Sequence, residues 1–139
     1  MTIETHTNIH QAEDEVLENR AAAPAMIKGA RGKCPSCGTT KLFTGGLKVQ
    51  DKCANCQEEF HHHRADDLPA YLNIFIVGHI VVAATMIVMD AKILSLWPLI
   101  GLACVSAILL AVVLMRPLKG MVVGAQWAMR MHGFGGHDD

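Results

Sequence analysis

The chain has 139 residues, with 12 Lys and Arg against 13 Asp and Glu, and its formal net charge at pH 7 is −1. This balance gives no overall field for binding nucleic acid. Hydrophobic residues make up 51% of the chain, but they are concentrated between Ala70 and Met115, which argues against one soluble core spread over the whole sequence.

Residues 1–30 contain five acidic residues and lack the apolar core of a secretory signal peptide. The first strongly apolar segment begins near Tyr71, too late for a cleaved signal. We expect residues 1–30 to be mostly a flexible N-terminal tail, with room for a short helix at residues 13–20, and to stay in the cytoplasm.

Residues 31–64 contain two CxxC motifs, C-P-S-C and C-A-N-C, separated by fifteen residues. Their thiols belong to Cys34, Cys37, Cys53 and Cys56. This spacing is typical of a zinc ribbon, in which four thiolates hold one tetrahedral Zn²⁺ and leave no open position for catalysis. Iron is the alternative metal, and a pair of redox CxxC motifs is the alternative to metal binding, although the βαβ frame of a thioredoxin-like site is missing. We therefore predict a cytoplasmic zinc ribbon with a structural Zn²⁺, since thiolate ligands require a reducing compartment.

Two short strands within residues 41–50, joined by a turn at Gly45 and Gly46, are expected in this ribbon. A domain this small depends on its metal for stability. The ribbon carries a mild excess of Lys and Arg but no run of aromatic residues for stacking on bases. That combination favours anionic lipid headgroups over nucleic acid as its charged partner.

Histidines and aspartates occupy the junction that follows the ribbon. The three histidines, His61–His63, either bind copper or zinc weakly or form a polar segment at the membrane interface. One carboxylate of the pair Asp66 and Asp67 suffices to cap the next helix, which leaves the other for a cation or a protein partner. Pro69 suits the first turn of that helix.

Residues 65–116 are predicted to form a transmembrane hairpin with spans at about 71–89 and 93–115. Neither span contains Asp, Glu, Lys or Arg. A helix of nineteen residues covers about 28 Å, close to the ~30 Å of a hydrocarbon core. The short turn after the first span makes the helices antiparallel. We expect the small face formed by Gly101, Cys104 and Ile108 to let the first helix approach closely.

Cations flank the hairpin at its two outer ends, with only Lys92 in the turn between the spans. The positive-inside rule then places both termini in the cytoplasm, at a bacterial inner membrane. Residues 117–139 are predicted to form a short amphipathic helix at that interface, followed by a tail. Its apolar side carries Leu118, Met121, Val122, Ala125 and Met129, with Trp127 nearby.

His79 lies about halfway along the first span, where a polar ring is costly, so it should face the partner helix or another protein. A hydrogen bond across a helix interface, ligation of haem or copper, and proton transfer are the open alternatives. Cys104 and most methionines are interpreted as packing residues. The sequence contains no evident nucleophile–base pair or open metal site, so we do not predict an enzyme.

These motifs together resemble the domain-of-unknown-function family 983. The resemblance covers about Gly32 to Phe134 and rests on C-P-S-C-G-x-x-x-L-F-x-G-x-L-K, the second C-x-x-C, H-H-H-R-A-D-D-x-P-A-Y, I-V-G-H-I-V-V and L-x-R-P-L-K-G-x-x-x-x-x-Q-W-A. Two positions depart from the family pattern: Gln57 replaces a glycine after the second CxxC, and Leu68 replaces a glycine after the two aspartates.

The family has no established enzymatic activity. Its members occur in alphaproteobacteria, often encoded beside subunits and assembly factors of cytochrome c oxidase. The resemblance therefore implies a role in the biogenesis or architecture of a haem–copper oxidase. We accordingly expect an accessory, subunit or assembly protein of a respiratory complex that docks on larger membrane subunits through its ribbon, Asp66, Asp67 and hairpin. The alternative is a protein that handles metal or haem through His79 and His61–His63.

Overall fold

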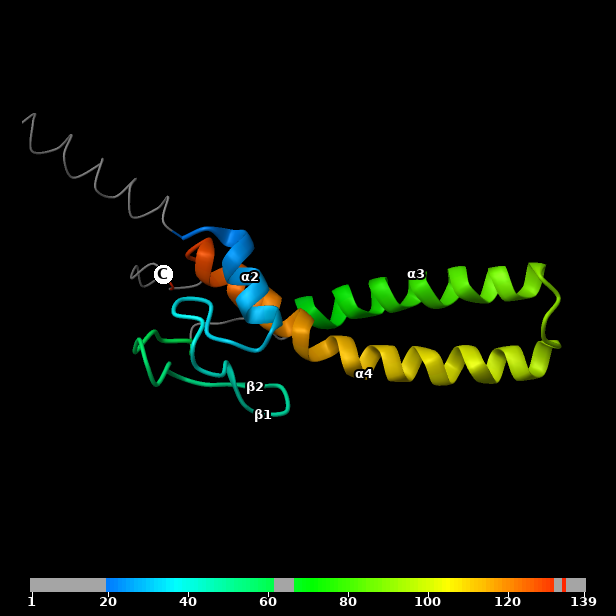
Figure 1. Cartoon of the computed structure of the whole chain (residues 1–139), viewed down its shortest axis with the longest axis horizontal. Helices are drawn as coiled ribbons and strands as arrows, with labels where there is room; N and C mark the ends of the chain where they lie inside the picture. The colour runs from blue at the N-terminus through cyan, green and yellow to red at the C-terminus, as the bar shows by residue number, and fades with distance from the viewer. Residues whose placement is uncertain (1–19, 62–66, 132–133, 135–139) are drawn as a thin grey trace, which may run out of the picture.

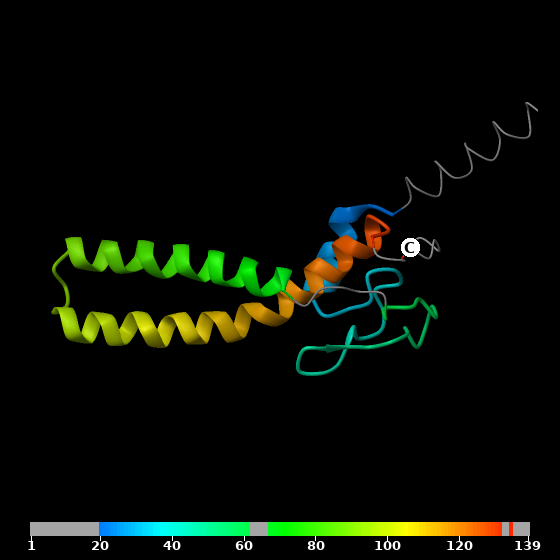
Figure 2. The same cartoon turned by 180° about the vertical axis from the view of Figure 1, so that it is seen from behind.

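A computed structural model describes residues 20–61, 67–131 and 134 of the chain. It contains three helices and two strands in these residues: α2 (Ala22–Ala30), β1 (Phe43–Gly45), β2 (Lys48–Val49), α3 (Leu68–Asp90) and α4 (Leu96–Ala128). Two long helices lie side by side and project from a head in which the ribbon, α2 and the end of α4 pack together (Figure 1). The same arrangement is seen from behind in Figure 2.

The ribbon contains the predicted pair of short strands. Strands β1 and β2 are antiparallel, with Phe43 opposite Val49, and the turn between them places Gly46 at a φ of 53°. Two isolated bridges, between Lys33 and Lys41 and between Lys52 and Glu59, close the loops that carry the first and the second CxxC motif. Leu42, Phe43, Val49 and Phe60 are buried and form the apolar part of the head together with residues of α2 and α4. The small sheet therefore packs on the helices and does not stand alone.

Helices α3 and α4 form the predicted antiparallel hairpin, joined by residues 91–95. Both are long and apolar enough to cross a membrane, and only 11% and 6% of their most apolar windows are buried. A core helix of a soluble protein would be mostly covered. These helices instead present their apolar side chains outwards, which is compatible with a membrane protein.

The faces that join the two long helices differ from the prediction. A side chain on Gly101 would meet no atom within 4 Å, and Ile108 is 64% exposed. The small face of α4 therefore points away from α3. Contact is made instead by residues such as Val77 and Leu99, which are buried, and by Asn73, whose Nδ2 donates to the Ala111 carbonyl oxygen at 2.9 Å.

Helix α2 lies within the segment predicted to be a flexible tail, and the structure differs from that prediction over these nine residues. Its backbone packs directly on the last turns of α4. A Cβ on Gly29 would fall on the carbonyl group of Gly120, and one on Gly124 would lie 2.5 Å from the Ala25 carbonyl oxygen. Small residues four positions apart, Ala25 and Gly29 in α2 and Gly120 and Gly124 in α4, thus let the two helix backbones come into contact.

The predicted short helix after Pro117 is the continuation of α4, not a separate element. Pro117 has no N–H to bond back to the preceding turn, and α4 bends in the orange segment that contains it (Figure 1). Beyond the bend, Val122, Val123 and Trp127 are buried in the head. Much of the apolar face predicted for a membrane surface is therefore covered by the protein itself, whereas Met129 remains 59% exposed.

Candidate metal centre

The first CxxC motif begins immediately after α2. The helix ends in a Schellman motif: the Gly32 N–H donates to the Gly29 carbonyl at 2.8 Å and the Lys33 N–H to the Lys28 carbonyl at 2.9 Å. Gly32 adopts the positive φ of 71° that this ending requires. Cys34 comes directly after Lys33, the last residue of this motif, so the helix end determines where the first thiol lies.

The two motifs fold into equivalent turns. In the first, the Gly38 N–H donates to the Cys34 carbonyl at 2.9 Å; in the second, the Gln57 N–H donates to the Cys53 carbonyl at 3.1 Å. Both closing residues have positive φ, 72° at Gly38 and 59° at Gln57. The side chain of Gln57, where the family resemblance implies a glycine, is therefore strained.

The four thiols converge on one point. All four Sγ atoms lie within 4.8 Å of one another, and the Cys34–Cys56 and Cys37–Cys53 pairs are each 3.7 Å apart. None of these cysteines is in a disulfide. A tetrahedral Zn²⁺ with Zn–S bonds of about 2.3 Å requires sulfur atoms about 3.8 Å apart. The observed spacing fits such an ion, so the predicted ligand set is brought together and is able to bind a metal such as zinc.

Hydroxyl and amide groups surround the sulfurs. Thr39 Oγ1 lies 3.1 Å from Cys37 Sγ, Thr40 Oγ1 lies 2.9 Å from Cys53 Sγ, and the Cys56 N–H points at Cys53 Sγ over 3.5 Å. Desolvation opposes a thiolate at Cys37, but hydrogen bonds from Thr39, Thr40 and Asn55 outweigh it and lower the pKa to about 5. Burial raises the pKa of the Cys34 thiol instead. Such donors suit thiolates that are shared with a cation.

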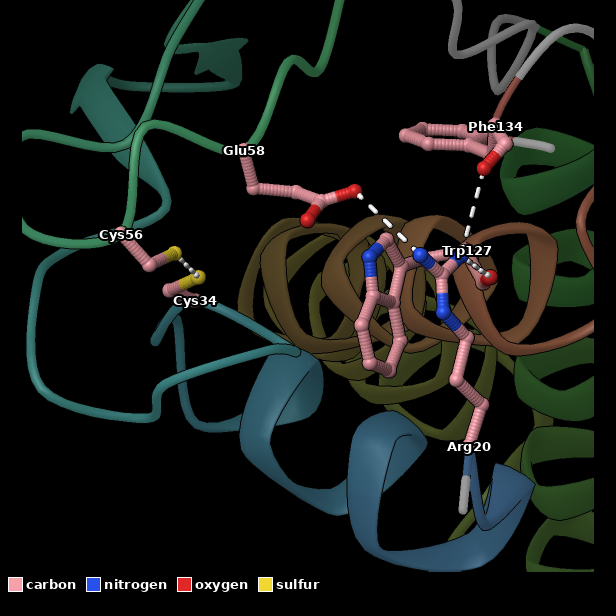
Figure 3. A network of polar contacts seen from close by, with 6 residues as sticks. All are labelled: Arg20, Cys34, Cys56, Glu58, Trp127 and Phe134. Atoms are coloured by element: carbon pink, nitrogen blue, oxygen red, sulfur yellow. Dashed lines mark hydrogen bonds and ion pairs between the residues drawn. The ribbon is translucent and has the colours of Figure 1, made fainter. Parts of the chain in front are cut away.

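Two side chains, Lys28 of α2 and Arg20 just before it, connect the ribbon to the helices. Lys28 Nζ donates to the Ser36 carbonyl at 3.0 Å, within the first CxxC motif. Arg20 lies over the Trp127 ring, 4.6 Å from its centroid, and donates to the carbonyls of Trp127 and Phe134. Figure 3 shows Arg20 also reaching Glu58, two residues after Cys56, at 3.9 Å. The metal centre and the end of α4 are therefore connected through one guanidinium group.

Of the residues predicted for partner binding, the structure describes Asp67 and His79, and neither belongs to the cluster of thiols. Asp66, His62 and His63 lie outside the described residues. Asp67 is exposed at the N-terminus of α3 and makes no side-chain cap, so the predicted capping role is not seen there. Pro69 occupies the first turn as expected. His61 is half-exposed, with its Nδ1 3.7 Å from a carboxylate oxygen of Glu59.

His79 lies on the outer side of α3 and does not face α4 as one alternative proposed. Its ring is exposed and lines a shallow apolar hollow with Ile74, Phe75, Gly78, Val82 and Ala83. Its Nδ1 lies 2.7 Å from the Phe75 carbonyl oxygen, which only accepts, so Nδ1 carries the proton. In the tautomer with its proton on Nδ1, the other ring nitrogen, Nε2, is an acceptor.

Sequence reasoning missed the docking of α2 on α4 and the Arg20 contacts. The spacing of Ala25 and Gly29, and of Gly120 and Gly124, was a usable signal, since small residues four apart mark close helix contacts. Arg20 offered no comparable signal, because all its partners, Glu58 in the ribbon and Trp127 and Phe134 beyond the second long helix's bend, are distant from it in sequence.

Comparison with known proteins gives one match. The family model described as "Protein of unknown function (DUF983)" matches residues 43–127. The matched range begins after the first CxxC motif and extends through both long helices to Trp127. Searches of curated proteins and of solved structures found no match.

Proposed function

The chain belongs to the DUF983 family, whose description assigns no function. From the geometry together with the gene neighbourhood implied by the family resemblance, we propose a non-enzymatic accessory, subunit or assembly protein of a respiratory complex in a bacterial inner membrane. The favoured partner is a haem–copper cytochrome c oxidase. The observation that carries this proposal is the contrast between a tightly packed head and a hairpin whose apolar side chains are almost entirely uncovered.

The head supports a structural role for its metal. Four thiolates around a Zn²⁺ fill all of its coordination positions, so no position is left for a substrate or an activated water. Cys34 and Cys53 are buried, and the ribbon packs on α2 and α4. We therefore assign the zinc to holding the ribbon in a fixed position at the end of the hairpin.

The arrangement of the chain supports one compartment for the head. The ribbon, α2 and the end of α4 pack together at the same end of the hairpin (Figure 2). A hairpin that spans the bilayer would thus keep all three on one side. Reduced thiols and the cations that follow the second span favour the cytoplasm. A short interfacial segment near Pro117, where α4 leaves the spans, completes the proposed placement.

The uncovered hairpin supports docking on larger membrane subunits. His79 is an exposed polar ring in the middle of an apolar helix, and its second ring nitrogen can bond to a neighbouring helix but not to lipid chains. The exposed small face of α4 is a second surface for close helix packing. The choice of an oxidase as partner rests on the gene neighbourhood implied by the family resemblance, and not on geometry.

Affinity purification from native membranes in a mild detergent tests this proposal. We expect subunits of a haem–copper oxidase to co-purify with the tagged protein. Gly78→Leu and Gly101→Leu form a matched pair, because a Cβ at either position meets no atom within 4 Å, yet they alter different helices. Loss of co-purification with one variant identifies the docking helix. Absence of every oxidase subunit from the wild-type preparation would overturn the proposal.

Handling of haem or copper by His79 is the second candidate, and one observation favours it. A ligating histidine usually donates its other ring N–H to a carbonyl or carboxylate, and the exposed His79 places Nδ1 2.7 Å from the Phe75 carbonyl oxygen, which leaves Nε2 for a metal. An absorption spectrum of the purified protein decides between the candidates. A Soret band or a copper signal that disappears in His79→Phe would support ligation, whereas a protein with zinc alone would speak against it.

A further inference from the structure

A pocket of about 490 Å³ lies where the ribbon meets the base of the hairpin. The turn between β1 and β2 supplies Gly46 and Leu47, and the two long helices supply Asn73, Val112, Met115 and Arg116. It therefore joins three parts of the chain that are distant in sequence. The described residues place no cysteine, and none of the candidate docking histidines, in its lining.

Asn73 provides a polar group that the described residues leave unsatisfied. The residue is only 3% exposed, and its Nδ2 donates to the Ala111 carbonyl oxygen at 2.9 Å. Its Oδ1 is buried and has no hydrogen-bond partner among the residues that the structure describes. A buried acceptor without a partner costs about 1–3 kcal/mol, so such groups in native proteins point to a water, an ion or a ligand that is not part of the chain.

Arg116 provides a positive charge on the same pocket. Its guanidinium lies over the ring of Phe43, 5.2 Å from the centroid, and the residue remains exposed. This cation–π contact with Phe43 holds the guanidinium beside the pocket. A planar fork of this kind pairs bidentately with a phosphate.

The position of the pocket along the hairpin matches the level of lipid headgroups. Arg116 is the first charged residue after the 23 uncharged residues 93–115, and Asn73 lies in the second turn of α3. Val112 and Met115 continue the pocket towards the apolar part of the hairpin. A ligand that fills it would therefore have a polar end beside Arg116 and Asn73 and an apolar chain along α4.

We propose that this pocket binds one anionic phospholipid, phosphatidylglycerol, with its phosphate on Arg116 and a headgroup hydroxyl donating to Asn73 Oδ1. One acyl chain lies along Val112 and Met115. The single negative charge of the lipid matches the single cation of the pocket, and the glycerol headgroup supplies the donor that Asn73 requires. Phosphatidylcholine has the phosphate but no N–H or O–H group to donate. This inference rests on the hairpin spanning a membrane, but not on the proposed respiratory partner.

Native mass spectrometry of the full-length, metal-loaded protein in detergent tests the site, with phosphatidylglycerol and phosphatidylcholine added separately. We expect one tightly retained phosphatidylglycerol and at least a tenfold preference over phosphatidylcholine. Arg116→Gln should abolish the preference by removing the cation. Val112→Trp should abolish retention by filling the pocket, while both polar groups stay in place. Thermal stability and metal content identify any variant that fails to fold.

Lys92→Gln is the matched control, because it removes one positive charge at the opposite end of the hairpin. It should retain phosphatidylglycerol as the wild type does. Equal retention of the two lipids, retention that survives both pocket variants, or an equal loss in Lys92→Gln would overturn the site. Occupation of the pocket by a partner protein in the native complex, detected by a photo-crosslinker at Val112, would overturn it as well.

Discussion

Gly29 and Gly120 bring the backbones of α2 and α4 into direct contact, although 90 residues lie between them in the sequence. A Cβ on Gly29 would lie 2.8 Å from the Gly120 carbonyl carbon, and one on Gly120 would lie 2.7 Å from the Gly29 carbonyl carbon. Backbone atoms cannot move aside as a flexible side chain can. Any side chain at either position must therefore separate α2 from α4.

Substitution of Gly120 by alanine should destabilise the head. The added methyl group has no space, and overpacking of this kind costs about 1–3 kcal/mol. We expect a lower thermal midpoint in detergent and faster hydrogen exchange in α2. Gly101→Ala is the control in the same helix, because its Cβ meets no atom within 4 Å. Equal stability of the two variants would show that α2 does not dock as described.

Removal of a ribbon cysteine should remove the metal. Cys34→Ser and Cys53→Ser each take away one of four convergent thiols. We expect elemental analysis to find one zinc per chain in the wild type and none in either variant. Cys104→Ser is the control, because Cys104 lies exposed on α4, outside the cluster. Unchanged metal content in the first two variants would refute the assignment of these thiols as ligands.

Changes at the two turn-closing residues should have opposite signs. Gln57→Gly relieves a side chain at φ 59°, whereas Gly38→Ala introduces one at φ 72° and within 3.3 Å of the Lys28 side chain. Each substitution should change the free energy of unfolding of the ribbon by roughly 1 kcal/mol. The measurement is the chelator concentration that extracts half of the zinc, which should rise for Gln57→Gly and fall for Gly38→Ala. A shift in the same direction for both would contradict the equivalence of the two turns.

Replacement of Arg20 by lysine should loosen the contact between the ribbon and α4. Lysine keeps the charge but loses the planar group that stacks on Trp127 and donates to two carbonyls, so we expect a loss of about 1–2 kcal/mol. Fluorescence of Trp127 reports the change in a Trp97→Phe background, since Trp97 is 80% exposed and would obscure it. A red shift is expected with Arg20→Lys; an unaltered emission maximum would argue that the stacking contributes little.

Reporter fusions test the orientation of the hairpin. A green fluorescent protein at the C-terminus should fluoresce, because both termini are proposed to be cytoplasmic, and alkaline phosphatase inserted after Lys92 should be active on the other side of the membrane. The inverse pattern would place the ribbon outside the cytoplasm and would contradict the argument from reduced thiols.

The metal centre and the hairpin followed from the sequence because both depend on local order along the chain. Two CxxC motifs at the right spacing predict convergent thiols, and uncharged stretches of sufficient length predict spanning helices. The two strands and the antiparallel hairpin were found as predicted. Hydropathy and the spacing of the cysteines can be read within one segment of the chain, so these two predictions did not depend on which other segments pack against it.

Only the tertiary structure shows which faces of α2, α3 and α4 pack against one another. Apolar residues surround α3 on all sides, so no apolar stripe distinguishes its contact face, and the face of α4 that contains Gly101 was assigned to the wrong side. Likewise, α2 is ordered by its contact with Gly120 and Gly124, and Arg20 by partners at the far end of the chain. Such contacts form between segments that meet only after folding, because steric fit at short range, and not composition, selects them.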